Sequence, residues 1–161
     1  LKEITVNNSK VSEMISDAVL QLGENLNIGQ FKIFTTSGGF SKYEHTNGKI
    51  GVVVEFTNTV DSEVGRDIAM QVAAMNPPYV SSDQVPSSDI ENESEILRKQ
   101  AIAEGKPEQV VEKIIQGRLS KFYKENCLVE QVFVKNPDQV IKDLLSDGTT
   151  IASFERFSLV G

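Results

Sequence analysis

The sequence predicts an α+β fold, and three observations support this prediction. Residues 9–22 have the apolar spacing of an amphipathic helix. The segments that follow are rich in β-branched and aromatic residues and are broken by glycine-containing turns, which is typical of antiparallel strands. Residues 88–126 carry two apolar stripes separated by a glycine and a proline, the pattern of a helical hairpin. We expect two related subdomains, residues 1–60 and 61–161, with small antiparallel sheets packed by helices, and a protruding antiparallel helical hairpin.

The N-terminal half should contain one helix and a three-stranded meander. Gly23 is placed to end the helix that starts near Ser9. The strand-like segments are 25–36, 40–45 and 49–59. Their breaks are Ser37-Gly38-Gly39 and Asn47-Gly48, and the second pair suits a two-residue type I′ turn.

The next helix is unusually apolar. Asp61 can cap it, and Pro77-Pro78 prevents it from continuing. From Ile68 to Met75 every residue except Gln71 is apolar, so the helix must be buried on most sides or offer one face to another protein. One interpretation is a core helix between sheet and hairpin. The other adds a partner surface that includes Gln71.

The C-terminal half begins with the helical hairpin. Ser88 and Glu91 form a capping-box pattern, and Gly105-Lys106-Pro107 separates the two helices. After the hairpin we expect a strand at 128–134, a short helix from Asn136 through Leu145, and a last strand at 149–160. The pattern Ile-x-x-Phe-x-x-Phe occurs at both Ile28 and Ile151, which suggests two related half-domains.

Composition excludes several classes of protein. The net charge of −7 argues against nucleic acid as the main partner. The single cysteine, Cys127, allows no intramolecular disulfide. No apolar run reaches the roughly 18 residues of a membrane span, and the N-terminus lacks a signal sequence, so we expect an intracellular chain. Since it begins at Leu1, we also expect a fragment of a longer protein.

The sequence offers little for catalysis. The only histidine, His45, lies beside a turn and has no recognisable nucleophile paired with it. Around Gly48-Lys49 the phosphate-loop pattern is incomplete, because its first glycine and its Ser/Thr are missing. No Cys/His cluster has metal-ligand spacing. We expect no catalytic residue, no metal, no cofactor and no direct nucleotide binding.

The apolar helix and the hairpin resemble one family, translation elongation factor Ts of bacteria and organelles. The resemblance lies in "DIAMQVAAMNPPYV" and in residues 95–134, which include Gly105-Lys106-Pro107-Glu108 and Gly117-Arg118-Leu119. "GENLNI", "KIGVVVE" and "FERFSLVG" extend it over most of residues 23–161. The resemblance implies a guanine-nucleotide exchange factor that binds elongation factor Tu, promotes GDP release by protein contact and stabilises the nucleotide-free form.

The resemblance also implies the site. Its residues would be Ile50 and Gly51 on a strand, and Asp67, Ile68, Met70 and Gln71 on the apolar helix. Gln71 stands where the family often has a histidine, and glutamine cannot become charged. We expect Gln71→Ala to lower exchange with little loss of stability. The small N-terminal helical domain and the Thr-Asp-Phe motif of the family are not found, so weak binding and poor exchange are expected.

Three functions stay open from the sequence. The first is nucleotide exchange on elongation factor Tu, and the second is a scaffold that binds this partner without exchange. The third, an enzyme, would have to use His45. The expected compartment is the cytoplasm, with the mitochondrial matrix or chloroplast stroma as the alternative, and homodimerisation is left open. No membrane or nucleic-acid partner is expected.

Overall fold

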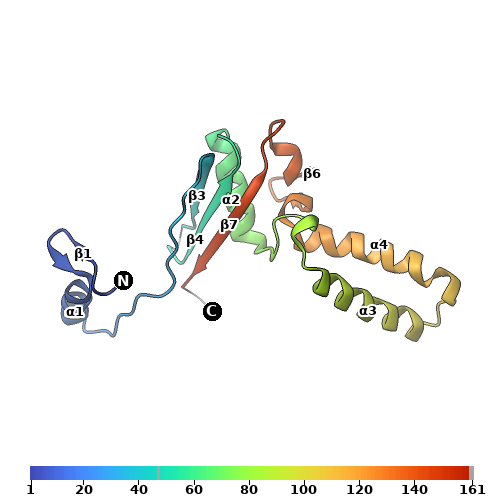
Figure 1. Cartoon of the computed structure of the whole chain (residues 1–161), viewed down its shortest axis with the longest axis horizontal. Coiled ribbons are helices and arrows are strands. Elements are labelled where there is room, and N and C mark those ends of the chain that lie inside the picture. Colours follow the sequence, from blue (N-terminus) through green and yellow to red (C-terminus); the bar gives the residue numbers. More distant parts are fainter. Residues whose placement is uncertain (47, 160–161) are drawn as a thin grey trace. The chain divides into compact units, whose positions relative to one another are not determined.

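A computed structural model describes residues 1–46 and 48–159 and shows two compact units, residues 1–34 and 35–161 (Figure 1). The predicted α+β class is confirmed, since helices and small antiparallel sheets are both present. The division expected between residues 60 and 61 falls inside the second unit. The two related subdomains therefore remain a prediction.

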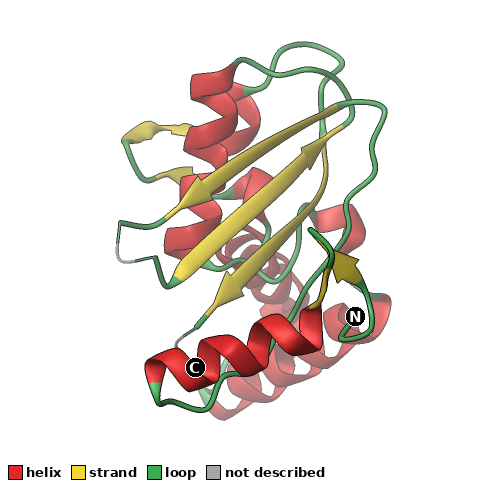
Figure 2. Cartoon of the chain, turned by 90° about the vertical axis from the view of Figure 1, so that its left-hand side faces the viewer, coloured by secondary structure: helices red, strands yellow, loops and turns green. Residues whose placement is uncertain are grey.

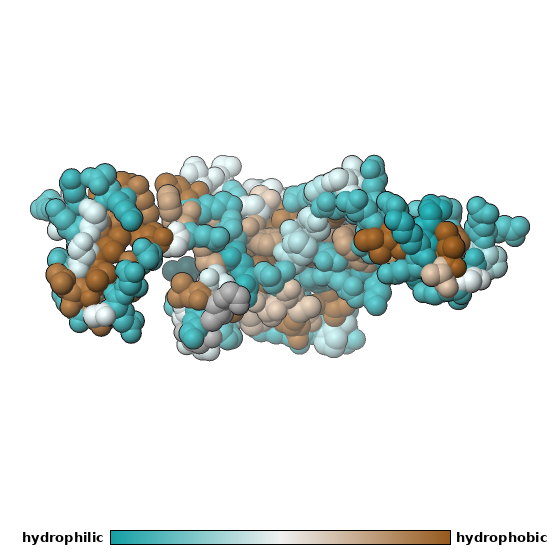
Figure 3. All heavy atoms as spheres, turned by 90° about the horizontal axis from the view of Figure 1, so that it is seen from below, coloured by the Kyte–Doolittle hydropathy of each residue, from teal (hydrophilic) through white to brown (hydrophobic). Residues whose placement is uncertain are grey.

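The first unit contains one helix and a very short hairpin. Its elements are β1 (Thr5–Val6), β2 (Ser9–Lys10) and α1 (Val11–Leu22). Gly23 ends α1 with a φ of +69°, as predicted. The amphipathic spacing of this helix predicts one buried apolar stripe, and that prediction is wrong, because no residue of α1 is buried. Leu20 is 82% exposed, and Figure 3 shows hydrophobic residues on the surface among hydrophilic ones.

The second unit is built on a three-stranded antiparallel sheet (Figure 2). Its strands, in spatial order, are β3 (Gly39–Glu44), β4 (Ile50–Phe56) and β7 (Ile151–Ser158). The predicted meander is wrong in its first strand, since residues 25–36 form no strand and β7 takes the third place. Asn47 of the predicted turn lies outside the described residues.

Helix α2 (Ser62–Met75) covers one face of this sheet (Figure 1). The Asp61 carboxylate accepts hydrogen bonds from the backbone nitrogens of Glu63 (2.9 Å) and Val64 (3.2 Å), so the predicted cap is confirmed. The side chains of Val52, Val54 and Phe56 alternate toward α2 and are buried. They form the centre of the main core together with apolar residues of α2.

The helical hairpin is confirmed as α3 (Ser87–Ala103) and α4 (Glu108–Asn126). It extends away from the sheet and has its own small core (Figure 1). The predicted capping box is wrong: Pro86 occupies the N-cap position, which places Ser88 inside the first turn of α3. The helix therefore starts two residues earlier than the pattern suggested.

The segment between α4 and β7 differs from the expected strand and helix. It contains η2 (Leu128–Glu130), β5 (Val132–Phe133), β6 (Asn136–Val140) and η3 (Ile141–Leu144), where η marks a 3₁₀ helix. The helix expected from Asn136 is wrong, because the Asn136 side chain accepts from the Asp138 nitrogen (3.1 Å) and β6 pairs with β5. Only its last turn, η3, is helical. The two Ile-x-x-Phe-x-x-Phe segments also differ, since only the second is a strand.

Candidate partner-binding site

The six residues expected at the partner surface lie on two neighbouring elements, the start of β4 and the middle of α2. They do not share one surface. Asp67 and Met70 are partly exposed, as are Ile50 and Gly51. Ile68 and Gln71 are 0% exposed. A partner that meets this conformation can therefore touch only four of the six.

Ile50 and Gly51 line a cavity of about 400 Å³. Its other walls include Tyr43 of β3, Arg66 of α2 and Phe157 of β7. A Cβ added to Gly51 would meet no atom within 4 Å, so the space in front of this glycine is open. An incoming side chain or backbone can approach β4 closely at this point.

Asp67 is already paired within the chain. Its carboxylate lies 2.5 Å from the Lys135 ammonium group at the β5–β6 turn. The Asp67 side chain is only 17% exposed, whereas that of Lys135 is 50% exposed. The sequence does not indicate that Lys135 belongs to this surface, because Lys135 is far from Asp67 along the chain and only folding brings it to α2.

Gln71 is part of the core rather than of the surface. Its Nε2 donates to the Val132 carbonyl and to the Gln131 side-chain oxygen, both at 3.1 Å. Its Oε1 accepts from the Val134 nitrogen at 2.9 Å. The interpretation of Gln71 as an exposed partner residue is therefore not supported by its position. It holds the β5–β6 hairpin against α2.

The two remaining helix residues contribute mainly to packing. Ile68 belongs to the main core, and Met70 packs against that core while part of its side chain stays accessible. Core packing was one of the two interpretations of this helix. The structure supports core packing for Ile68 and Gln71, whereas Met70 lies at the boundary between the core and the surface.

The β5–β6 hairpin adds residues that the sequence did not indicate. Val132 and Val134 are 50% and 47% exposed, although their backbone groups are bonded to Gln71. Exposed valines beside the Asp67–Lys135 pair give this edge of α2 a mixed apolar and charged character. The strand expected at residues 128–134 was the only signal of them in the sequence.

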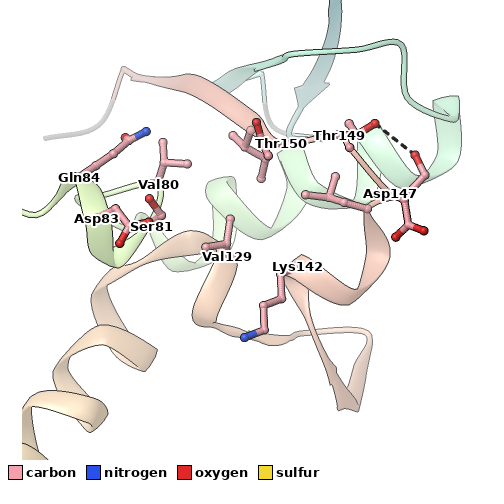
Figure 4. Close-up of a pocket in the computed structure, with 13 residues that line it drawn as sticks. Val80, Ser81, Asp83, Gln84, Val129, Lys142, Asp147, Thr149 and Thr150 are labelled. Carbon is pink, nitrogen blue, oxygen red and sulfur yellow. Dashed lines mark hydrogen bonds between the residues drawn. The ribbon is translucent and has the colours of Figure 1, made fainter.

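A second cavity, of about 550 Å³, contains none of the expected site residues (Figure 4). Ser81 and Asp83 lie on one side of it, and Asp147 and Thr149 come from the turn before β7. Lys142, which also lines it, lies 3.5 Å from the Glu130 carboxylate. The polar groups that line this cavity are thus bonded within the chain or open to solvent. They do not converge on one point where a ligand could be held.

Reactive chemistry is scarce in the described part of the chain. Burial, assisted by the charge of Glu130, raises the pKa of the Cys127 thiol to about 11, so the thiol is protonated near neutral pH. His45 Nδ1 lies 3.2 Å from the Tyr43 hydroxyl group. Residues 1–46 and 48–159 contain no group of three His, Cys, Asp or Glu side chains placed to hold a metal ion. None of the helices described is long and apolar enough to cross a membrane.

Within the second unit, several hydrogen bonds connect the base of the helical hairpin to the segment that follows α2. The Tyr79 hydroxyl donates to the Asp89 carboxylate of α3 at 2.7 Å, and this bond, more than burial, raises the pKa of Tyr79. The Tyr79 nitrogen donates to the carbonyl of Asn126, the last residue of α4, and the Tyr79 carbonyl accepts from the nitrogen of Leu128 in η2. The hairpin is therefore joined to the body of the unit through both of its helices.

A comparison with protein-family models gives a match over the full sequence. The model described as Elongation factor TS matches residues 1–161. The matched range includes the sheet, α2, the hairpin and the first unit.

Proposed function

Since this chain belongs to the elongation factor Ts family of protein biosynthesis, we propose that it is a guanine-nucleotide exchange factor for elongation factor Tu. It binds this partner through the start of β4 and the exposed edge of α2, promotes GDP release and stabilises the nucleotide-free form. The action requires protein contact and no covalent chemistry. The compartment proposed is the cytoplasm, with an organelle matrix or stroma as the alternative.

The observation that best supports a contact surface is the open space in front of Gly51. Gly51 is among the residues that line a cavity together with Ile50, Arg66 and Phe157, and a Cβ added to it would meet no atom within 4 Å. Such a notch admits a side chain of a protein partner. Asp67 and Met70 extend the surface along α2, while Ile68 and Gln71 support it from the core.

The mechanism follows from linkage. A protein that binds empty elongation factor Tu more tightly than its GDP complex must weaken GDP binding by the same factor. Each tenfold weakening needs about 1.4 kcal/mol of differential contact energy. No proton transfer or nucleophile is required, so the mechanism needs nothing from His45 or Cys127.

The test is the release of a fluorescent GDP analogue from elongation factor Tu. We expect the unmodified chain to accelerate release and Gly51→Val to reduce the acceleration at least tenfold, because the new side chain blocks the close approach of a partner to β4. Valine suits a strand and meets open space there, so the melting temperature should not fall. Gly117→Ala, on the exposed side of α4, is the control and should exchange normally.

A scaffold that holds elongation factor Tu is the competing function. Affinity capture and GDP release distinguish the two. Capture of elongation factor Tu without accelerated release would establish the scaffold and refute exchange. Failure of both assays, at protein concentrations high enough to detect weak binding, would refute the partner itself. Equal release rates for Gly51→Val and the unmodified chain would refute the proposed surface.

A further inference from the structure

Two glutamines are buried where α2 meets the base of the helical hairpin. Gln71, on α2, is 0% exposed, and Gln131, between η2 and β5, is 2% exposed. Glutamine is mostly found at protein surfaces, because its amide must otherwise find hydrogen-bond partners in the interior. Two such residues in contact inside one core call for a physical explanation.

The two amides form a chain of hydrogen bonds from α2 to α4. Gln71 Nε2 donates to Gln131 Oε1 at 3.1 Å, and Gln131 Nε2 donates to the Glu125 carbonyl at 2.9 Å. Glu125 lies in the last turn of α4, where carbonyl groups have no partner within the helix. Gln131 therefore caps the end of α4 while Gln71 holds Gln131 in place.

The same amide of Gln71 fixes the β5–β6 hairpin through Val132 and Val134. One side chain on α2 is thus bonded to the segment that carries the exposed valines and the Lys135 turn, and through Gln131 to the end of α4. In the described residues, every buried side-chain nitrogen or oxygen has a hydrogen-bond partner. A fully satisfied polar network of this kind restricts a core to one arrangement more strictly than apolar packing does.

We propose that Gln71 and Gln131 are positioning residues that hold the α3–α4 hairpin at one fixed direction relative to the exposed edge of α2. The hairpin and this edge then meet a partner as a single rigid body. Identification of the partner as elongation factor Tu rests on the proposed function, whereas the positioning does not. At the other helix of the hairpin, the hydrogen bond from the Tyr79 hydroxyl to Asp89 holds the start of α3.

Rigidity matters for exchange because the α3–α4 hairpin can keep its binding-competent direction only if its base is fixed. A loosely attached hairpin would have to be ordered at the moment of binding, and that entropy cost would reduce the affinity. Gln71 and Gln131 order it beforehand. Their loss should weaken binding of nucleotide-free partner about tenfold while the fold persists.

The first experiment measures positioning without a partner. Cysteines are introduced at two exposed positions, Thr59→Cys beside the sheet and Lys106→Cys between α3 and α4. Spin labels on these cysteines report the distance from the sheet to the tip of the hairpin. Cys127 is buried and its thiol is protonated, so it should not take up label. We expect one narrow distance distribution in the unmodified chain and a broad or shifted one in Gln71→Met/Gln131→Met.

Controls separate positioning from a general loss of fold. Methionine keeps the volume and removes the amides, and the single variant Gln131→Met serves if the double variant does not fold. Gln116→Met, on the exposed side of α4, should leave the distribution unchanged. A narrow, unshifted distribution in a folded variant that lacks the amides would overturn the proposal.

The second experiment measures GDP release with the same variants. Broadened distances together with weaker exchange support the whole proposal. Broadened distances in a chain that never accelerates release would support the positioning and refute the proposed function. Unchanged distances with active exchange would refute the positioning and leave the function standing.

Discussion

The amide of Gln71 makes three hydrogen bonds in a site that water does not reach. Each removed partner leaves a buried donor or acceptor unsatisfied, which costs more than the bond itself contributes. This residue is the clearest case in which an expected functional side chain has a structural position. Its substitution therefore has consequences for stability that the sequence did not indicate.

Gln71→Ala should destabilise the protein by about 2–4 kcal/mol, through unsatisfied groups on Val132 and Val134 and a cavity in α2. This reverses the sequence-based expectation of little stability loss. Denaturant unfolding measures the effect, and Gln116→Ala, exposed on α4, should stay within about 0.5 kcal/mol of the unmodified chain. An unchanged midpoint for Gln71→Ala would show that the network contributes nothing.

Cys127 and Tyr79 should make the fold sensitive to alkaline pH. Burial raises the pKa of Cys127 from 9.0 to about 11, and the bond to Asp89 raises that of Tyr79 above 10.0. Because the folded state holds these protons more tightly, their contribution is complete below the unfolded pKa values and is lost as the pH rises through the folded ones. The free energy of unfolding should fall between about pH 9 and 11.

The alkaline loss can be assigned by comparison with Cys127→Ala. This variant starts less stable, because it leaves a small cavity, but its stability should decline less steeply above pH 9. Parallel pH profiles for the two proteins would contradict the assignment to Cys127.

At the level of elements, α2 and β3 approach closely at Gly65. A Cβ on Gly65 would lie 2.9 Å from the Ser41 Cβ and 3.0 Å from a Val60 methyl group, and nearer still to the Ser41 hydroxyl. Helix and strand can touch here only because the glycine has no side chain. The packing of α2 on the sheet, and hence the position of the candidate site, depends on this contact.

Gly65→Ala should destabilise the fold by about 1–3 kcal/mol, the usual cost of overpacking, although alanine favours a helix. Gly117→Ala is the matched control, since it is also helical and its Cβ would meet nothing within 4 Å. The control should be unchanged or more stable by thermal unfolding. If both variants behave alike, the contact at Gly65 is not tight.

At the level of the whole molecule, the two units should differ in stability. Residues 1–34 fall below the roughly 40 residues that usually support an independent core, and none of α1 is buried. Residues 35–161 contain both core clusters. Local opening of the first unit should therefore cost little free energy.

Amide hydrogen exchange tests this difference. We expect the amides of α1 to exchange far faster than those of β4 and α2, which should follow global unfolding. A chain reduced to residues 35–161 should melt within about 3 °C of the full one, a shift that corresponds to less than about 1 kcal/mol. Cooperative unfolding of both units at one temperature would contradict the prediction.

Local patterns predicted the helices well. Gly23 ends α1, Asp61 caps α2, and the facing stripes of residues 88–126 form α3 and α4. Each of these signals lies within a few residues of the structure it specifies. The helix expected after Asn136 failed because its cap pattern also suits a turn, and pairing with β5 decided between them.

The sequence by itself determined the α+β class, the helical hairpin, the family and the position of the apolar helix. Only the tertiary structure decided that β7 pairs with β4, that Lys135 pairs with Asp67, and that Gln71 faces inward to Gln131. The physical reason is separation along the chain: helical spacing and caps act between neighbours, whereas strand partners and burial depend on residues far away. A polar residue on an apolar helix looks the same in sequence whether it meets solvent or a second amide.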